Sequence, residues 1–252
     1  MAEAAGGRGA SRASGAGRAS GASRASRRSN AASTRARAPL TRERIVAAAM
    51  TVADEGGLSA VSMRTVAREL GVEAMSLYHH VDGKDAMLDA IAEEIFSRFP
   101  LAELGAPWRQ ALTERAQGAR TVLAAHPWAL VLLESRVNPG PTVLRQHDRV
   151  LGVLRTNGFD VPLAGHAFSA VDAYVYGFVL SESNLPFTPE AGAEEFAAGL
   201  ALPAYEYPYL TEFMAVMLAG HDYDYGDEFD FGLELVLDQL ETRLAELQHG
   251  AG

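Results

Sequence analysis

The stretch that decides the fold reads Ser62-Met-Arg-Thr-Val-Ala-Arg-Glu-Leu-Gly-Val-Glu-Ala-Met-Ser-Leu-Tyr-His-His-Val81. Ser62 is a favoured N-cap residue for a first helix, and Gly71 supplies the left-handed residue that ends it. The apolar spacing then predicts two inward-facing sets, Val66, Ala67 and Leu70 on the first helix and Leu77 and Val81 on a short second helix, Glu73 to Val81. Two short helices joined by such a turn form a helix-turn-helix, which can place its second helix in the DNA major groove.

The second helix turns small or polar side chains outward. The outward set is Ala74, Met75, Ser76, Tyr78 and His79. A small N-terminal end followed by Ser, Tyr and His suits entry into a groove, because bulky acidic residues there would be repelled by phosphate. The alternative is a helical hairpin without a DNA role, since unrelated helical hairpins match the bare pattern.

The composition excludes several classes of protein. The chain of 252 residues has no cysteine, which rules out a disulfide framework, a Cys-based metal site and a Cys nucleophile. It has neither a run of 18 uninterrupted apolar residues nor the apolar core of a secretory signal, so we expect no membrane span and a cytoplasmic location. With 48% hydrophobic residues, the chain has ample material for a core.

The net charge of −10 conceals a strong asymmetry. Residues 1–39 hold eight Arg and one Glu, a net charge of +7, whereas residues 40–252 hold fourteen Lys or Arg and thirty-one Asp or Glu, a net charge of −17. Overall charge therefore cannot supply affinity for nucleic acid, and a local basic surface must do so.

Residues 1–39 form an Arg-, Ala-, Ser- and Gly-rich tail that we predict to be disordered, because it has too few large apolar side chains to offset its ordering entropy. Its role stays open among three interpretations. It is a solubilising extension, a basic arm that touches phosphates or a flanking minor groove, or an organellar transit peptide. The lack of large apolar residues argues against the amphipathic helix that targeting requires.

The rest of the chain predicts an all-α fold with a boundary near residue 100. In residues 40–100, a first helix carries Ile45, Ala49 and Val52 and stops at Gly56-Gly57, and Asp82 caps a fourth helix that runs toward Pro100. In residues 101–252, Pro and Gly separate further helices, and no useful stretch alternates with period two. The expected segments are Pro107–Ala125, Pro127–Val137, Pro141–Thr156, Val161–Asn184, Ala193–Leu200, Tyr207–Gly220 and Asp227–Gln248.

Two of these helices have more apolar surface than one core needs. The helix 161–184 is apolar nearly all round, and the helix 227–248 carries a long apolar stripe that begins at Leu233. Such a surplus predicts a second contact, such as a partner subunit.

Several residues at fixed spacing in this region match a known family of proteins. They are Arg64-x-x-Ala67-x-x-x-Gly71-Val72, Leu77-Tyr78-x-His80-Val81, Lys84 and Leu88, within Thr41–Ile91. This string strongly resembles the DNA-binding domain of the tetracycline repressor (TetR) family. The remainder, about 105–245, resembles the family's C-terminal domain with lower specificity, through His126-Pro127, the turn at 154–159 and Tyr174-x-x-Gly177-Phe178.

The resemblance implies an N-terminal helix-turn-helix domain, residues 40–100, and a helical ligand-binding and dimerisation domain, residues 101–252. It implies a homodimer in which the helices 161–184 and 227–248 pair with their symmetry mates as a four-helix bundle. It also implies a palindromic double-stranded DNA operator and a cavity for a small-molecule effector in each subunit.

Carried over position by position, the family's DNA contacts fall on ten residues: Ser62, Met63, Arg64, Ala74, Met75, Ser76, Tyr78, His79, His80 and Lys84. Arg64 is the best candidate for a base contact, since a guanidinium matches guanine O6 and N7, and a phosphate clamp is its alternative. We assign Tyr78 and Lys84 to phosphates. Ala74 and Met75 can offer only apolar contact, for example to a thymine methyl.

The effector pocket is harder to place. Its candidate residues are His126, Trp128, His147, Phe168, Tyr174 and Phe178, although each of these residue types is more often ordinary core. The resemblance puts a drug-binding His in the segment 130–136, which has none. We therefore do not expect tetracycline itself to be the effector.

The acidic segment 221–230 has two interpretations, a solvated loop or a site for a divalent cation. It lacks the Gly and terminal Glu positions of a calcium loop, so we predict no metal and no cofactor. We find no Gly-rich phosphate loop, G-x-S-x-G or H-E-x-x-H, so we predict no catalytic residues.

The leading hypothesis is a ligand-responsive, homodimeric transcriptional repressor that a small molecule releases from its operator. A transcriptional activator is an alternative, because the same DNA-binding domain serves activators and repressors. Two alternatives lack DNA regulation: a helical ligand-binding protein, and an enzyme whose His–carboxylate pair only the fold brings together.

Overall fold

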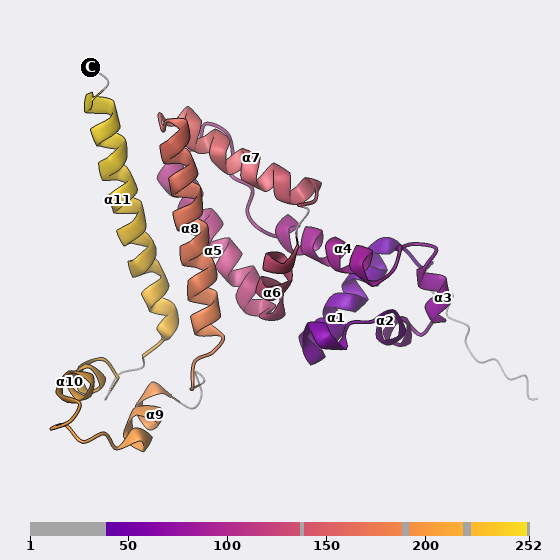
Figure 1. The fold of residues 1–252 in the computed structure, drawn as a ribbon, viewed down its shortest axis with the longest axis horizontal. Helices are drawn as coiled ribbons and strands as arrows, with labels where there is room; N and C mark the ends of the chain where they lie inside the picture. Colours follow the sequence, from indigo (N-terminus) through magenta and orange to yellow (C-terminus); the bar gives the residue numbers. More distant parts are fainter. Residues whose placement is uncertain (1–38, 137–138, 188–191, 219–222, 251–252) are drawn as a thin grey trace, which may run out of the picture. The chain divides into compact units, whose positions relative to one another are not determined.

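The observed secondary structure is helical, as the apolar spacing of the sequence predicts. A computed structural model describes residues 39–136, 139–187, 192–218 and 223–250. In these ranges the chain has eleven α-helices, one short 3-10 helix and no strand, which confirms the all-α prediction (Figure 1). Residues 1–39 and 40–252 are separate units of the chain, and the helices all belong to the second. The predicted disordered tail lies outside the described residues, except for Pro39.

The head is built from four helices whose ends follow local chemistry. They are α1 (Arg42–Ala60), α2 (Met63–Leu70), α3 (Ala74–Leu77) and α4 (Lys84–Ser97). Ser62 caps α2 as predicted: its hydroxyl accepts from the Thr65 backbone N–H at 3.1 Å, and the Thr65 hydroxyl accepts from the Ser62 N–H at 2.9 Å. Gly71 then ends α2 with a left-handed φ of 64°, which glycine adopts without strain.

Two details of the head differ from the prediction. The N-cap of α4 is Gly83 and no side chain caps this helix, so the predicted capping by Asp82 is wrong. The second helix of the motif is also shorter than predicted, because α3 ends at Leu77 and residues 78–80 continue as turns. The Gly56-Gly57 stop is found as a break inside α1, where Gly57 has a φ of 70° and a ψ of 177°.

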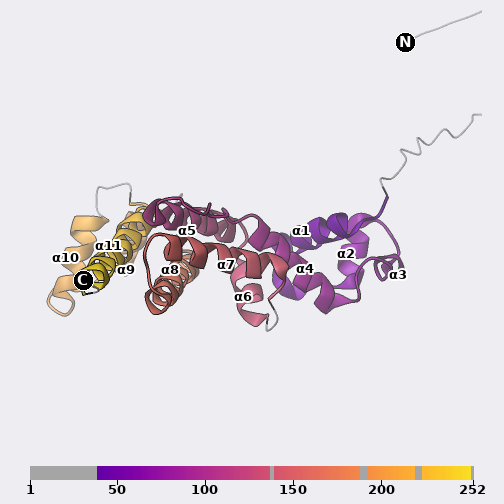
Figure 2. The same cartoon turned by 90° about the horizontal axis from the view of Figure 1, so that it is seen from above.

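The remaining helices match the predicted segments closely. They are α5 (Trp108–Ala125), α6 (Trp128–Ser135), α7 (Pro141–Thr156), α8 (Val161–Glu182), α9 (Ala193–Leu200), α10 (Pro208–Met217) and α11 (Glu228–Gly250), with the 3-10 helix η1 (Tyr225–Asp227) before α11. Helix α8 is central, since α5, α7 and α11 all pack against it, as Figure 2 shows for α5. Helix α4 packs against α1 on one side and against α6 and α7 on the other.

One buried ion pair lies inside this helical layer. Arg115 on α5 is 2% exposed, and its Nη1 lies 2.5 Å from Oδ1 of Asp172 on α8, whose side chain is 13% exposed. Two atoms of the described residues are buried without a partner, Nε of Arg115 and Oε1 of Gln146. The attraction between the two side chains offsets part of the desolvation cost of burying their charges.

Helix α8 and the residue after it, Val161–Ser183, are long and apolar enough to cross a membrane by length and composition alone. The expectation of no membrane span rested on a different criterion, a run of 18 uninterrupted apolar residues, which this helix does not contain because His166, Ser169 and Asp172 interrupt it. The packing of α5, α7 and α11 against α8 explains its composition, since the core helix of a helical domain meets the same criteria.

Candidate DNA-binding surface and effector cavity

The outward face of the helix-turn-helix is exposed as the sequence predicts. Met75 is 72% exposed and Tyr78 is 49% exposed, whereas Leu77 between them is completely buried. Arg64, His79, His80 and Lys84 are also exposed, and Ser62, Ala74 and Ser76 are half-buried. Short α3 thus presents one face to solvent. Leu77 on its other face, and Val81 after the turn that follows, pack into the core.

Met63 differs from the other predicted contact residues. Its side chain is 9% exposed and belongs to the core cluster that also holds Val66 and Ala67. Since a buried thioether packs against its neighbours and does not reach a groove, we leave Met63 out of the contact set proposed below.

Cations at this surface have no acidic partner. Among the described residues, Arg64, Arg68 and Lys84 form no ion pair within 4.0 Å. By contrast, several arginines of the later helices are paired, for example Arg109 with Asp238 and Arg120 with Glu182. A guanidinium or ammonium that is exposed and unpaired keeps its full charge available to a phosphate.

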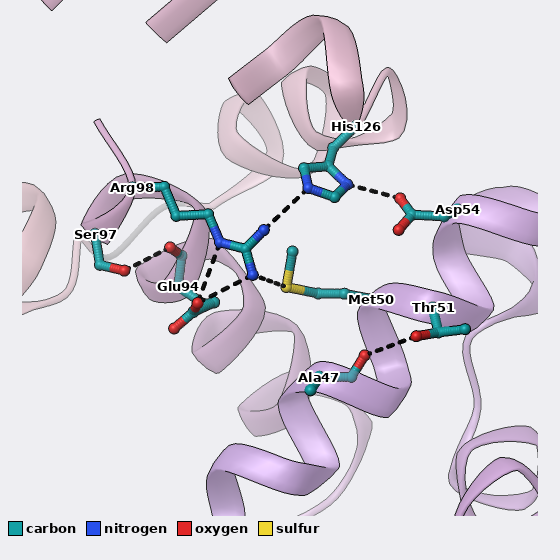
Figure 3. Close-up of polar contacts among 8 residues, drawn as sticks. All are labelled: Ala47, Met50, Thr51, Asp54, Glu94, Ser97, Arg98 and His126. Atoms are coloured by element: carbon teal, nitrogen blue, oxygen red, sulfur yellow. Dashed lines mark hydrogen bonds and ion pairs between the residues drawn. The ribbon is translucent and has the colours of Figure 1, made fainter. Parts of the chain in front are cut away.

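A polar cluster joins the head to the later helices (Figure 3). Oδ1 of Asp54 on α1 accepts a hydrogen bond from Nδ1 of His126 at 2.7 Å. The same oxygen accepts a second one from Nε1 of Trp128, also at 2.7 Å. The guanidinium of Arg98 lies 3.1 Å from Nε2 of His126, and it also contacts Glu94 at 3.1 Å and Sδ of Met50 at 3.6 Å. The first turn of α6 is therefore hydrogen-bonded to α1.

The cluster defines the tautomer of His126. Arginine only donates, so Nε2 facing Arg98 must be the acceptor, and Nδ1 facing the Asp54 carboxylate must carry the proton. A neutral imidazole with its proton on Nδ1 satisfies both contacts at once. The ring then works as a bridge between α1 and the residue that follows α4.

A cavity of about 600 Å³ lies among α1, α4, α6, α7 and α8. This volume is within the range of small-molecule sites in proteins. Phe96, His147 and Phe168 supply adjoining aromatic rings, with centroids 6.0 Å apart for Phe96–His147 and 4.9 Å apart for His147–Phe168. The full lining is Arg42, Asp89, Ala92, Glu93, Phe96, Leu133, Glu134, Arg136, Pro139, Gly140, Pro141, Val143, His147, Phe168, Asp172 and Tyr176.

The six predicted pocket residues divide into three groups. His147 and Phe168 line the cavity, whereas His126 and Trp128 lie in the cluster with Asp54. Tyr174 and Phe178 pack instead against the start of α11. The Tyr174 hydroxyl donates to the Phe229 carbonyl at 2.8 Å, and the Phe178 ring lies 5.0 Å from the Phe229 ring. These four residues are core and contact residues of the fold, not lining of this cavity.

Sequence reasoning missed most of the polar lining, although one signal for it was present. Phe168, Asp172 and Tyr176 follow one another at intervals of four, so they lie on one face of α8. An aspartate inside an otherwise apolar helix marks that face, because a carboxylate there needs a partner or a water-filled space. The lining residues from α1, α4 and α6 have no comparable signal in the sequence, because only the tertiary fold brings these helices together.

Burial shifts two titratable groups of the cavity. Desolvation lowers the pKa of His147, with Arg115 acting in the same direction and Asp172 against it, so the imidazole is neutral at pH 7. Desolvation also raises the pKa of the Tyr176 hydroxyl well above its ordinary value, and Asp172 adds to this, so the hydroxyl stays protonated. The cavity thus offers neutral hydrogen-bonding groups beside its charged ones.

The acidic segment 221–230 gives no metal site in the part that the structure describes. Residues 223–250 contain η1 and the start of α11, where Asp224 accepts from the Gly226 N–H at 2.7 Å. No group of three or more His, Cys, Asp or Glu side chains in the described ranges is placed to hold a metal ion. Residues 219–222 lie outside those ranges.

Comparisons with known proteins agree with the geometry. The chain matches the family described as "Bacterial regulatory proteins, tetR family" over residues 45–91. It matches the "Tetracyclin repressor-like, C-terminal domain" over residues 99–244. Together the two matches cover most of the helix-turn-helix head and most of the helices that surround the cavity.

Individual relatives match over most of the chain. The HTH-type transcriptional repressor DrrR1 of Streptomyces coeruleorubidus is 34% identical over 218 residues, which cover 82% of this chain and 79% of that protein. The class D tetracycline repressor protein of Escherichia coli is 32% identical, with coverage of 83% and 93%. Among solved structures, ActR of Streptomyces coelicolor in complex with actinorhodin has a TM-score of 0.66 and 28% identity, with coverage of 82% and 99%.

Proposed function

We propose that this chain, which belongs to the tetracycline repressor (TetR) family of bacterial regulatory proteins, is a homodimeric repressor that a small-molecule effector releases from a palindromic operator. Its relatives are DNA-binding transcriptional regulators of the helix-turn-helix type. The observation that carries the proposal is the exposed, unpaired set around Arg64 and Tyr78 on a head whose helices α1 and α4 also line a ligand-sized cavity.

In the proposed complex the head reads one half of the operator. Arg64 contacts a guanine edge or a phosphate, and Tyr78 and Lys84 hold phosphates and so set the register. Met75, 72% exposed, offers an apolar contact such as one to a thymine methyl. The proposed contact set also includes Ser62, Ala74, Ser76, His79 and His80.

The proposed dimer uses helices α8 and α11. One side of α11 packs on α8 through Phe229, Leu233 and Leu237, but Phe231 and Leu235, four residues apart, are 64% and 58% exposed on the other side. On α8, Val161 and Leu180 are 68% and 54% exposed. A second copy of the chain would cover these apolar groups and space the two heads by about one turn of DNA, roughly 34–36 Å.

The effector is proposed to act through α4 and α6. On α4, Asp89, Glu93 and Phe96 line the cavity, while the same helix packs into the head next to α1. On α6, Glu134 lines the cavity and Trp128 donates to Asp54 of α1. A ligand that favours another spacing of these helices shifts the heads away from their DNA-binding positions. By thermodynamic linkage, bound DNA lowers the affinity for the ligand by the same factor by which the ligand lowers the affinity for DNA.

A regulator of this kind needs neither catalysis nor a membrane. We therefore propose that the chain has no enzymatic activity and works in the cytoplasm, as its relatives' names as transcriptional repressors support.

The test is selection of bound fragments from random and genomic DNA by the purified full chain at two salt concentrations. We expect enrichment of a palindrome whose affinity falls as salt rises, because phosphate contacts release counterions. Enrichment of no sequence at either salt concentration would contradict the proposal. Enrichment of a single half-site would contradict the dimer alone.

A further inference from the structure

The cavity has an aromatic part that is suited to a flat ring system. Phe96 is 6% exposed, and with His147, Phe168 and Tyr176 it surrounds one side of the 600 Å³ space. His147 lies edge-on to both phenylalanine rings, at interplanar angles of 81° and 66°. Rings arranged in this way present both faces and edges, which a planar aromatic guest can stack against or meet at its rim.

Two neutral polar groups in this part have no protein partner. Within the described residues, neither the Tyr176 hydroxyl nor the ring nitrogens of His147 make a hydrogen bond. Both side chains line the cavity, so a guest that displaces water from it must supply hydrogen bonds to these groups. A guest with hydroxyl or carbonyl groups on its ring edge satisfies them.

The charges of the lining are predominantly negative. Four carboxylates, on Asp89, Glu93, Glu134 and Asp172, meet two guanidinium groups, on Arg42 and Arg136. The Arg115 guanidinium behind Asp172 reduces this excess without removing it. The net charge of −17 on residues 40–252 acts in the same direction over longer distances.

Most of these carboxylates are already engaged. Asp172 pairs with Arg115 and Asp89 pairs with Arg136 at 3.2 Å. Glu93 accepts from the Thr142 N–H at 2.8 Å at the start of α7. Glu134 is the carboxylate of the lining for which the described residues provide neither an ion pair nor a hydrogen bond.

We propose that the effector is a polycyclic aromatic molecule that carries a positively charged amine, with its rings among Phe96, His147 and Phe168 and its ammonium beside Glu134. This inference rests on the proposed function in one respect, that the cavity is the effector site. The sign of the charge follows from the lining. An anion would approach an excess of carboxylates, whereas an ammonium gains a charge-assisted hydrogen bond.

Three probes with one ring system test the charge: 2-(aminomethyl)anthraquinone, 2-(hydroxymethyl)anthraquinone and anthraquinone-2-sulfonate. Each is titrated into the full-length protein by isothermal titration calorimetry at low salt. We expect the ammonium probe to bind about five- to tenfold tighter than the hydroxymethyl probe, and the sulfonate to bind weakest. Tightest binding by the sulfonate, equal binding by all three, or binding by none overturns the proposal.

Glu134→Gln then tests the place of the ammonium. We expect this variant to lose most of the preference for the ammonium probe over the hydroxymethyl probe while its affinity for the latter is unchanged. The matched control is Glu114→Gln, an exposed carboxylate on α5 outside the lining, which should keep the full preference. An unchanged preference in Glu134→Gln overturns the assignment of the amine to this residue.

DNA affinity measured on the same preparations without any probe separates the two proposals. Salt-dependent operator binding together with no probe binding overturns the effector class and leaves the regulator in place. A preference for the ammonium probe in a protein that binds no DNA supports the ligand class and overturns the proposed regulator.

Discussion

Nδ1 of His126 lies 2.7 Å from Oδ1 of Asp54, so the residue between α5 and α6 contacts the first helix of the DNA-binding head. The same oxygen accepts from Trp128 at 2.7 Å, and the Trp128 side chain is buried. One carboxylate oxygen therefore joins α1 to the start of α6 through two hydrogen bonds.

Removing the carboxylate should weaken the fold through this joint. Asp54→Ala is expected to lower the free energy of unfolding by about 1–3 kcal/mol, because it leaves the buried Trp128 N–H without an acceptor. Urea denaturation measures the effect, and the exposed neighbour Glu55→Ala is expected to change stability by less than about 0.5 kcal/mol. In a cycle with His126→Ala, purely additive losses would show that the two residues are not coupled.

Arg64→Ala should reduce operator affinity and selectivity together. If Arg64 contacts a guanine edge, the variant loses about 1–3 kcal/mol of binding free energy and tolerates other bases at one operator position. Fluorescence anisotropy on the selected operator and on single-base variants of it measures both. Equal weakening on all sequences would assign Arg64 to a phosphate instead. Arg145→Ala, an exposed arginine on α7, is the control that should leave binding unchanged.

Lys84→Ala should change the salt dependence and not the sequence preference. An ammonium on a phosphate releases about one counterion, so the slope of log affinity against log salt should fall by about one. Anisotropy titrations at four or five salt concentrations give this slope. A slope equal to that of the unmodified chain would exclude a phosphate contact by Lys84.

Phe231→Glu combined with Leu235→Glu should produce a monomer. Burying two carboxylates at a helix–helix contact costs more than the contact gains, whereas both positions are exposed within one subunit, so the fold is kept. Analytical ultracentrifugation measures the mass, and circular dichroism checks the helices. Leu144→Glu, 54% exposed on α7, is the matched control and should remain a dimer. A dimeric double variant would place the interface elsewhere.

Stability should fall on acidification in a manner that depends on His147. Burial holds the pKa of the folded-state imidazole below its ordinary value of 6.5, so the unfolded chain binds the proton more readily. The free energy of unfolding therefore decreases as pH falls from about 7 through 6.5 toward the folded-state pKa, and stops changing on this account below it. The free energy of unfolding of the His147→Gln variant should decrease less over the same pH interval than that of the unmodified chain. An equal decrease in His147→Gln and in the unmodified chain would contradict this assignment.

Local chemistry made the helices predictable. The capping of α2 by Ser62, the left-handed Gly71 and the proline at the start of α7 are signals carried by one to four neighbouring residues. The predicted bounds of α7 and α9 agree with the structure, and the inward positions of Leu77 and Val81 follow from their spacing. Interactions at the ends of one helix do not need the rest of the chain to be in place.

The sequence by itself determined the eleven-helix order, the inward and outward faces of the head and the family resemblance. Only the tertiary structure decided which aromatic residues line the cavity. Tyr174 and Tyr176 are two positions apart on α8 and so point about 200° apart at 100° per residue, one to α11 and one into the cavity. Asp172 marks one face of α8 in the sequence, but only the helices packed around α8 determine which of its aromatic side chains line the cavity.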